Sequence, residues 1–165
     1  DDKGRLQPTS LAEVTGRTLR LLGDNWNRHG IKVVVDLPAD LPAAMARPQQ
    51  LQQVLLNLLM NAKDALAEGA RAERTIWLTG RAQDGRVVLS VRDNGPGVPE
   101  HLGLRVFEPF VTTKRARGGT GLGLSVSKGI VESAGGAIEL RNRPGEGAEF
   151  VVNLPRAEAD PLSPA

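Results

Sequence analysis

Residues 49–66 read QQLQQVLLNLLMNAKDAL and predict the strongest helix of the chain. At about 100° per residue, Asn57, Asn61 and Asp64 share one narrow face, and an apolar stripe occupies another. The stripe contains Val54, Leu55, Leu58, Leu59, Ala62, Ala65 and Leu66. Solvated helix faces usually carry Lys and Glu, which form helices better than Asn and Asp. The polar face is therefore either a solvated surface or a set of hard oxygen ligands for a cation such as Mg²⁺.

The segments around this helix predict an α+β fold of two layers. Further helices are expected over 10–28, 99–106 and 122–134, and strands over 31–37, 43–47, 75–83, 86–92, 137–142 and 149–154. Ser10 is the expected N-cap of the first helix, with Glu13 completing a capping box. Asp84-Gly85 predicts a tight hairpin. This order favours a two-layer α/β sandwich in which helices cover one face of a mixed sheet.

Length and composition fit one domain cut from a longer protein. The 165 residues are 40% hydrophobic and 24% charged, as in ordinary globular domains. The opening Asp1-Asp2-Lys3 resembles neither a signal peptide nor an ordinary initiator. We expect a linker stump over 1–9, the domain over 10–155 and a disordered tail over 156–165.

Composition disfavours several classes of partner. A net charge of +2, with three Phe, two Trp and no Tyr, offers little for nucleic-acid binding. The absence of Cys excludes disulfides and thiolate metal sites and favours a reducing, cytoplasmic compartment. No apolar run approaches the length of a membrane span, so we expect no membrane contact by this domain.

An acidic, glycine-containing turn follows the strand expected over 86–92. It reads Asp93-Asn94-Gly95-Pro96-Gly97, and these residue types favour turns in any protein. The alternative is a binding role, because an ionised carboxylate accepts hydrogen bonds only and suits an exocyclic amine such as that of adenine. Gly95 and Gly97 would then let a flat ring approach the backbone.

A glycine-rich segment, Gly118-Gly-Thr-Gly-Leu-Gly-Leu124, leads directly into the helix expected over 122–134. Backbone amides at a helix N-terminus bind phosphate well, but a flexible hinge would have the same composition. The segment is not a P-loop, because no Lys-Ser or Lys-Thr follows the glycines. A polar loop precedes it where a dinucleotide-binding motif would have a strand.

Together, these motifs and their order resemble the superfamily of gyrase, heat-shock chaperone, histidine kinase and mismatch-repair ATPases. Asn57-Leu-Leu-Met-Asn61-Ala-Lys-Asp64-Ala is similar to its N box, and 93–97 to its G1 box. Phe107-Glu-Pro-Phe110 is similar to the F box of sensor histidine kinases, and 119–124 to the G2 box. The segment 145–150 resembles the closing hairpin of the same kinases. The resemblance covers 10–154, and its short Thr-Thr-Lys loop is similar to nitrogen-regulatory and dicarboxylate-sensing kinases.

The resemblance implies a Bergerat ATP-binding fold that binds ATP with Mg²⁺. It implies that Asn61 coordinates the metal, Asn57 lies beside the metal and phosphates, and Asp93 binds the adenine amino group. Lys114 would reach the outer phosphates from an ATP lid over 111–120. The implied nucleotide-binding residues are Asn57, Asn61, Asp64, Asp93, Gly95, Gly97, Val98, Thr112, Thr113, Lys114, Gly119, Thr120, Gly121, Leu122, Gly123 and Leu124. Asp64 could bind water or the ribose side, or only cap structure. Arg115 and Arg117 could contact phosphate or a partner, or be solvated lid charges.

Asn57 discriminates among branches of the superfamily. Hydrolysing branches place a Glu general base at this position, whereas Asn cannot take a proton at neutral pH. A general base contributes about 10²–10⁴-fold, so an ATPase clamp is disfavoured. A histidine nucleophile needs no such base, and Asn57 and Lys114 would serve as the catalytic residues of phosphotransfer.

We therefore expect the chain to donate the γ-phosphate of Mg-ATP to a histidine on a separate dimerisation and phosphoacceptor domain. The alternative is a nucleotide-binding regulatory module without phosphotransfer. Neither His29 nor His101 has the acceptor pattern, although His101 could contact the nucleotide or be a solvated loop residue. A response regulator would be an indirect partner, and the domain alone should be a monomer.

The aromatic residues have expected structural roles. We expect Trp26 and Trp77 to pack in the fold, and Phe107 and Phe110 to anchor the lid or dock on the partner helices.

Overall fold

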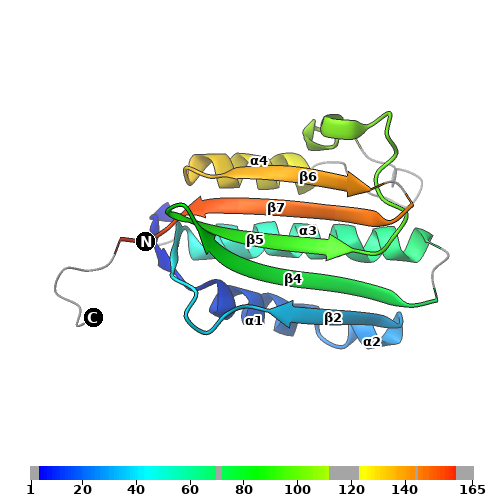
Figure 1. Cartoon of the computed structure of the whole chain (residues 1–165), viewed down its shortest axis with the longest axis horizontal. Helices are drawn as coiled ribbons and strands as arrows, with labels where there is room; N and C mark the ends of the chain where they lie inside the picture. The colour runs from blue at the N-terminus through cyan, green and yellow to red at the C-terminus, as the bar shows by residue number, and fades with distance from the viewer. Residues whose placement is uncertain (1–3, 70–71, 112–122, 144, 159–165) are drawn as a thin grey trace.

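The computed structural model describes residues 4–69, 72–111, 123–143 and 145–158 (Figure 1). Its elements follow in the order β1 (Gln7–Thr9), α1 (Leu11–Leu22), α2 (Asn25–Arg28), β2 (Ile31–Asp36), β3 (Ala44–Ala46), α3 (Pro48–Glu68), β4 (Arg74–Gln83), β5 (Arg86–Asp93), the 3-10 helix η2 (Gly103–Phe107), α4 (Gly123–Ser133), β6 (Ala137–Arg143) and β7 (Gly147–Pro155). Pro48 opens α3, where its missing N–H costs no hydrogen bond.

The main sheet has five strands in the order β2-β4-β5-β7-β6. β2 runs parallel to β4, and every other neighbouring pair is antiparallel. Figure 1 shows α1, α3 and α4 behind the sheet, whereas no described helix lies in front of it. The α+β sandwich with helices on one face of a mixed sheet is therefore confirmed.

The core lies between α3 and the sheet. Every member of the predicted apolar stripe except Ala65 is buried, and Leu55, Leu58 and Leu59 are each at most 1% exposed. They face the buried sides of the central strands, which include Leu89 and Val152. Burying one Leu side chain stabilises a fold by about 1.5–3 kcal/mol, so this contact fixes the position of α3 against the sheet. The polar face of α3 is held in place by the same packing.

The first helical region differs from the single helix expected over 10–28. Ser10 caps α1 as predicted, since its Oγ accepts a hydrogen bond from the Glu13 N–H at 3.3 Å. The helix ends at Gly23, which has a φ of 59° and donates to the carbonyls of Leu19 and Arg20. A left-handed glycine is a common helix stop, and the short helix α2 begins afresh after it.

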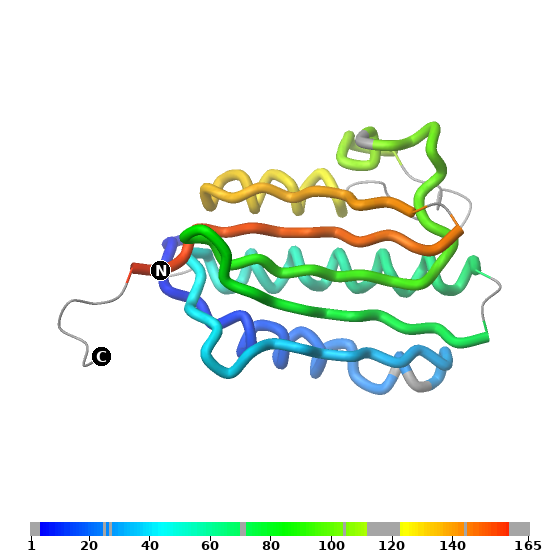
Figure 2. Tube along the Cα trace, in the orientation of Figure 1, coloured from blue at the N-terminus to red at the C-terminus, as the bar shows by residue number. Residues whose placement is uncertain are grey.

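The two ends of the described chain also differ from expectation. Gln7–Thr9, expected to be linker, form β1 and pair antiparallel with β3. The tail expected from 156 begins with ordered contacts, because Arg156 N–H donates to Gly85 at 3.0 Å and Ala157 N–H donates to Ala43 at 2.8 Å. Figure 2 shows the first and last segments at the same end of the sheet. Such short strands form only when tertiary neighbours supply the hydrogen bonds, which local sequence does not show.

Candidate functional site

The acidic turn is packed against α3. Asp93 ends β5 with only 3% of its surface exposed, and its Oδ1 accepts a hydrogen bond from the Gly95 N–H at 2.9 Å. A Cβ at Gly95 would lie 3.2 Å from the Ala65 carbonyl oxygen of α3 and 3.0 Å from Asp93 Oδ1. Glycine at position 95 therefore allows the turn to lie on the backbone of α3. This contact brings the predicted carboxylate close to α3.

Asn94 has a structural role that the sequence did not reveal. Its Oδ1 accepts from the Thr75 N–H at 2.9 Å, and its Nδ2 donates to the Glu73 carbonyl at 2.8 Å. The side chain thus replaces a strand partner at the start of β4. Asn94 anchors the turn to β4, which helps to fix the position of Asp93.

The second half of the turn is held by the β6–β7 hairpin. Gly97 has a φ of 80°, and a Cβ there would lie 2.9 Å from Asn142 Oδ1. Asn142 accepts from the Val98 N–H at 2.8 Å and donates to the Val98 carbonyl at 2.6 Å. A Cβ at Gly147 would lie 2.0 Å from the Asp93 carbonyl oxygen. Asn142 and Gly147 thus fix the turn, and sequence reasoning missed both because their partners lie more than 40 residues away.

The other end of the polar face is joined to α4. Asn57 Nδ2 donates to the Gly123 carbonyl at 3.1 Å and to Ser127 Oγ at 3.2 Å. Its Oδ1 accepts from Gln53 Nε2 at 2.8 Å. The amide of Asn57 therefore ties α3 to the first turn of α4, where the glycine-rich segment ends. Two of the predicted site residues, Asn57 and Gly123, are in direct contact.

Asn61 and Asp64 lie between these two ends of α3, and both are half-buried. From Asn57 to Ala65, which touches Gly95, an α-helix rises about 12 Å. The described residues contain no group of three or more His, Cys, Asp or Glu side chains that could hold a metal ion. An amide oxygen suits a hard cation whose remaining ligands are phosphate and water, so Asn61 fits Mg²⁺ that arrives with a nucleotide.

Several predicted site residues lie outside the described part of the chain. They are Thr112, Thr113, Lys114, Arg115, Arg117, Gly119, Thr120, Gly121 and Leu122. Leu124, in the first turn of α4, is half-buried against the core. His101 is exposed just before η2, and no described contact joins it to the turn.

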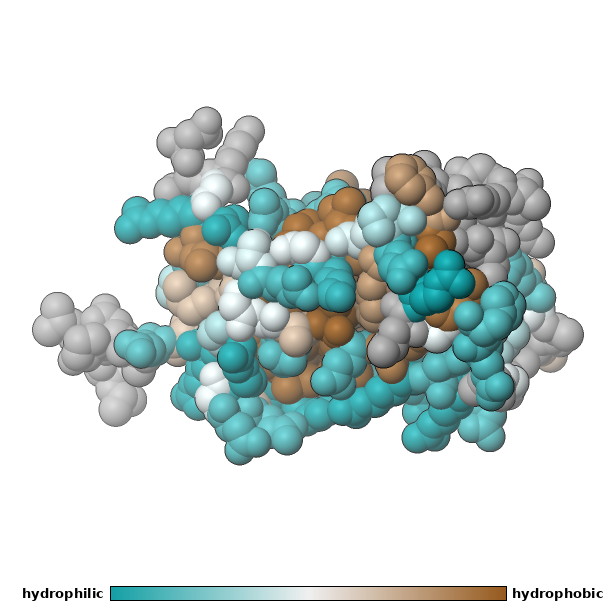
Figure 3. Space-filling model, turned by 90° about the horizontal axis from the view of Figure 1, so that it is seen from above, coloured by the Kyte–Doolittle hydropathy of each residue, from teal (hydrophilic) through white to brown (hydrophobic). Residues whose placement is uncertain are grey.

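The two phenylalanines of the F box differ in burial. Phe107 is 8% exposed and packs edge-on against Phe150, with ring centroids 6.0 Å apart, so it anchors η2 in the core. Phe110 is 58% exposed and has a φ of 67°. Val126 of α4 is 46% exposed. Figure 3 shows hydrophobic residues reaching the surface among hydrophilic ones when the molecule is viewed from above.

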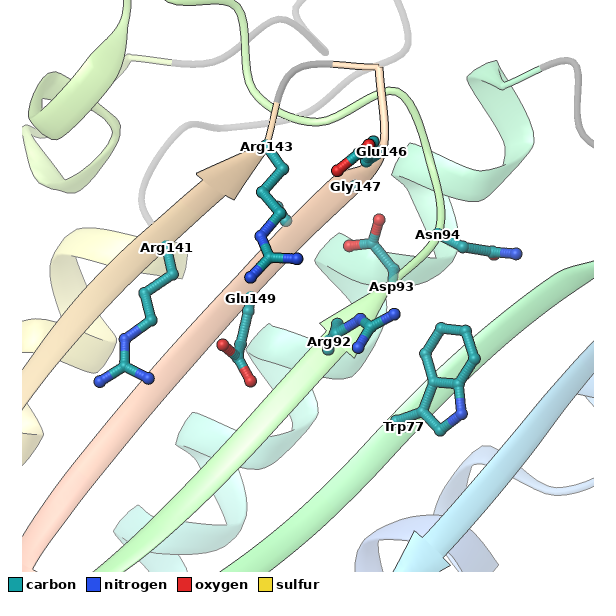
Figure 4. A pocket seen from close by; sticks show the side chains of 10 residues that line it. Trp77, Arg92, Asp93, Asn94, Arg141, Arg143, Glu146, Gly147 and Glu149 are labelled. Atoms are coloured by element: carbon teal, nitrogen blue, oxygen red, sulfur yellow. The ribbon is translucent and has the colours of Figure 1, made fainter.

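A hollow of about 370 Å³ opens on the bare side of the sheet, and Asp93, Asn94 and Gly147 are among the residues that line it (Figure 4). Alternation along β5 directs Arg92 to this side, whereas the buried Asp93 belongs to the helix side. The Arg92 guanidinium lies 4.6 Å from the centre of the Trp77 ring, and Glu149 accepts from Ser90 at 2.6 Å. Trp77 thus packs beneath an arginine on the open face, and Trp26 is buried, as expected.

The geometry agrees with comparisons to known proteins. The sequence profile of "Histidine kinase-, DNA gyrase B-, and HSP90-like ATPase" matches residues 46–158, more than half of the chain. The chain belongs to this family. Within it, the similar proteins are sensor histidine kinases, so the chain is the catalytic, ATP-binding domain of a protein histidine kinase, as the motifs predicted.

Two curated relatives illustrate the similarity of this histidine kinase domain. It is 45% identical over 142 residues to the two-component sensor PprA of Pseudomonas aeruginosa, covering 84% of this chain and 15% of PprA. It is 38% identical over 150 residues to the C4-dicarboxylate transport sensor protein DctB of Rhizobium meliloti, covering 91% of this chain and 23% of DctB. The domain thus spans less than a quarter of either relative.

Solved structures share its fold. The catalytic domain of histidine kinase ThkA aligns with a TM-score of 0.79 at 29% identity, covering 92% of this chain and 98% of that one. Full-length ShkA in complex with AMPPNP aligns with a TM-score of 0.79 at 34% identity, covering 93% of this chain and 32% of ShkA. ThkA in complex with the response regulator TrrA aligns with a TM-score of 0.76 at 28% identity, covering 92% of this chain and 42% of the ThkA chain.

Among the described helices, none is both long enough and apolar enough to cross a bilayer.

Proposed function

We propose that this histidine kinase domain binds Mg-ATP along the polar face of α3 and donates the γ-phosphate to a histidine of a separate domain. The observation that carries the proposal is the fixed position of Asp93. This carboxylate is buried, oriented by the Gly95 N–H and placed beside α3 by a turn that α3, β4 and the β6–β7 hairpin hold together. A buried charge held this firmly suits the recognition of a hydrogen-bond donor.

At this end of the site, Asp93 would accept a hydrogen bond from the adenine amino group. Gly95 and Gly97 would let the base lie against the turn, with the side chain of Val98 nearby. Asn142 engages both backbone polar groups of Val98, so the turn keeps its shape when the site is empty. A turn organised before binding reduces the entropy lost when the ligand binds.

At the opposite end, Asn57, Asn61 and the first turn of α4 would face the phosphates. The N-terminus of α4 carries partial positive charge, and the glycine-rich segment leads into it. Asn61 would hold Mg²⁺, which neutralises phosphate charge when bound, and Lys114 would contribute a second positive charge. The rise of about 12 Å between Asn57 and Ala65 separates the proposed phosphate end of the site from the proposed adenine end.

The side chain of Asn57 supports phosphotransfer rather than hydrolysis. An amide is no general base, and its nitrogen already donates to Gly123 and Ser127. Catalysis would then consist of positioning and charge neutralisation, as in other phosphoryl transfers. The attacking group would be the imidazole nitrogen of a histidine on the dimerisation and phosphoacceptor domain. It attacks the γ-phosphorus, the bond to the β–γ bridging oxygen breaks, and ADP leaves.

The rest of the proposal concerns the whole protein. The domain would extend from β1 to the bonds made by Arg156 and Ala157. It would work in the cytoplasm, and a response regulator would later receive the phosphoryl group from the acceptor histidine. Phe110, which follows η2, and Val126, on α4, have exposed side chains, and we expect the acceptor helices to dock there.

Transfer of γ-labelled phosphate tests this function. The chain is incubated with labelled Mg-ATP, with and without the separately prepared dimerisation and phosphoacceptor domain of the same protein. We expect acid-labile label on the acceptor domain alone, and none on this chain, whose His29 and His101 lack the acceptor pattern. The matched control is the acceptor domain with its histidine replaced by glutamine.

Two outcomes would contradict the proposal. Nucleotide binding without transfer to an intact acceptor domain would favour the regulatory module. Rapid release of inorganic phosphate without any acceptor would favour an ATPase.

A further inference from the structure

The outer edge of β2 has the pattern of a strand that pairs with itself. β2 lies at the end of the sheet order and pairs with β4 alone among the described strands. Figure 1 shows it as the lowest strand of the sheet, with α2 near its beginning. Such an edge offers a row of backbone N–H and C=O groups for another strand. Proteins usually protect such edges with charges or proline.

The charges on β2 are complementary under a twofold axis. The strand reads Ile31-Lys-Val-Val-Val-Asp36, with Lys32 and Asp36 both exposed. If two copies pair antiparallel about Val34, Lys32 of each copy lies opposite Asp36 of the other. Two like charges at these positions would oppose self-pairing, whereas this opposite pair favours it. A symmetric dimer repeats every contact, so the one strand supplies two Lys–Asp pairs.

Apolar exposure occurs on the same edge. Val35 is 43% exposed, although Ile31 and Val33 on the same face of β2 pack in or against the core. Leu21, on the underlying helix α1, is 65% exposed. In the twofold arrangement, Val33 and Val35 of each copy lie opposite Val35 and Val33 of the other. This places four valines together on the helix side of the joined sheets. Cross-strand pairs of β-branched residues stabilise antiparallel sheets.

The edge has room for an added strand near α2. A hollow of about 420 Å³ is lined by Trp26, Gly30, Ile31, Lys32 and Val33, between α2 and the first half of β2. In the same register, the chain that follows Asp36 of the second copy would pass this hollow. The space needed by the partner therefore exists where α2 comes closest to the strand.

We infer that two copies of this chain associate through antiparallel pairing of β2, centred on Val34, to form a continuous ten-stranded sheet. Two six-residue strands bury less surface than a standard interface, so the dimer is weak and reversible. This inference departs from the monomer that the sequence led us to expect. The edge lies outside the nucleotide site, and its test does not depend on the proposed function.

A single cysteine tests the register directly, because the chain contains no Cys. Directly opposed residues have Cα atoms about 4.5–5.5 Å apart, within the range of a disulfide. We expect Val34→Cys to form a disulfide-linked dimer under mild oxidation. In the matched control, Val35→Cys, the two cysteines are diagonal neighbours about 7–8 Å apart. That variant should form at least tenfold less dimer in the same time, although its side chain is the more exposed.

Charge exchange tests the pairing by sedimentation equilibrium of the full chain. Lys32→Asp and Asp36→Lys each replace two attractive pairs by two repulsive ones, so each should raise the dimer dissociation constant at least tenfold. The double variant restores complementarity and should return within about threefold of the original value. Arg81→Asp, on β4 beyond the paired segment, is the matched control and should have no effect. Circular dichroism verifies that each variant is folded.

Three results would overturn the inference. One is a wild-type chain that stays monomeric up to its solubility limit. Another is faster crosslinking of the Val35→Cys variant than of the Val34→Cys variant. The third is a double charge variant that associates no better than either single variant.

Discussion

Gly147 shows how one residue controls the position of the site carboxylate. It begins β7 with a φ of 121°, and a Cβ there would lie 2.0 Å from the Asp93 carbonyl oxygen. Real Cβ atoms do not approach a backbone oxygen so closely, so any side chain at 147 must push the Asp93 backbone away. The close packing of the hairpin on the turn therefore requires glycine at this position.

Gly147→Ala should consequently destabilise the fold and weaken nucleotide binding. We expect a loss of about 3 kcal/mol or more in the free energy of unfolding, from backbone overlap together with the unfavourable φ. Gly145→Ala in the same hairpin is the matched control, because its φ is also positive, at 82°, but no atom lies within 4 Å of the added Cβ. It should lose only about 1 kcal/mol. Urea unfolding measures the free energy of unfolding of the two variants. Equal midpoints for Gly147→Ala and Gly145→Ala would show that the contact with Asp93 is unimportant.

At the scale of elements, the joint between α3 and α4 connects the two motifs that we propose to face the phosphates. Asn57 makes this joint through its two hydrogen bonds to Gly123 and Ser127. The joint fixes where α4 begins, and the glycine-rich segment ends there. This amide side chain therefore helps to position the N-terminus of α4.

Asn57→Ala should weaken binding of Mg-ADP about tenfold, while the affinity for adenosine should stay within about twofold. The reason is that the lost bonds order the phosphate end, each worth about 0.5–1.5 kcal/mol, and leave the adenine end intact. Gln53→Ala is the control, because it removes a contact to Asn57 but leaves both bonds to α4. Calorimetric titration gives the affinities of the wild type and of each variant for Mg-ADP and for adenosine. An equal loss for adenosine and Mg-ADP would mean that Asn57 acts only on overall stability.

The elements also show what sequence could and could not predict. The periodicity of α3 and the Asp84-Gly85 hairpin were correct because each depends on neighbours along the chain. The break at Gly23 was missed because apolar spacing continued across it. β1 was missed because three residues carry no periodic signal, and its hydrogen bonds come from β3. The clamp by Asn142 depends on a distance across the fold that no local pattern contains.

At the scale of the whole molecule, the two faces of the sheet have different surroundings. The helix side holds the core, the polar face of α3 and the buried Asp93. The open side carries Arg92, Trp77 and Glu149, and no described helix covers it. The residues proposed to bind nucleotide thus occupy one end of the helix layer. The β2 edge is separate from them, since β4 lies between β2 and β5, the strand that ends at Asp93.

We propose that Asp93 recognises the amino group of adenine, and calorimetric titration of an Asp93→Asn variant is the direct test of this role. Asparagine keeps an oxygen for the Gly95 N–H, so the turn should stay folded, but the charge is lost and an amide donor can face the adenine donor. A charged hydrogen bond is worth about 1.5–3 kcal/mol, and about 1.4 kcal/mol is a factor of ten in affinity.

We predict that a nonhydrolysable ATP analogue with Mg²⁺ binds the Asp93→Asn variant at least tenfold more weakly than the wild type. The Glu146→Gln variant, a nearby carboxylate change in the open-face hollow, should bind as the wild type does. The inosine counterpart of the analogue carries a carbonyl oxygen in place of the amino group, so the Asp93→Asn variant, which offers an amide donor, should bind it at least as tightly as the wild type does. Unchanged affinity of a folded Asp93→Asn variant for the adenine analogue would contradict recognition of the adenine amino group by Asp93.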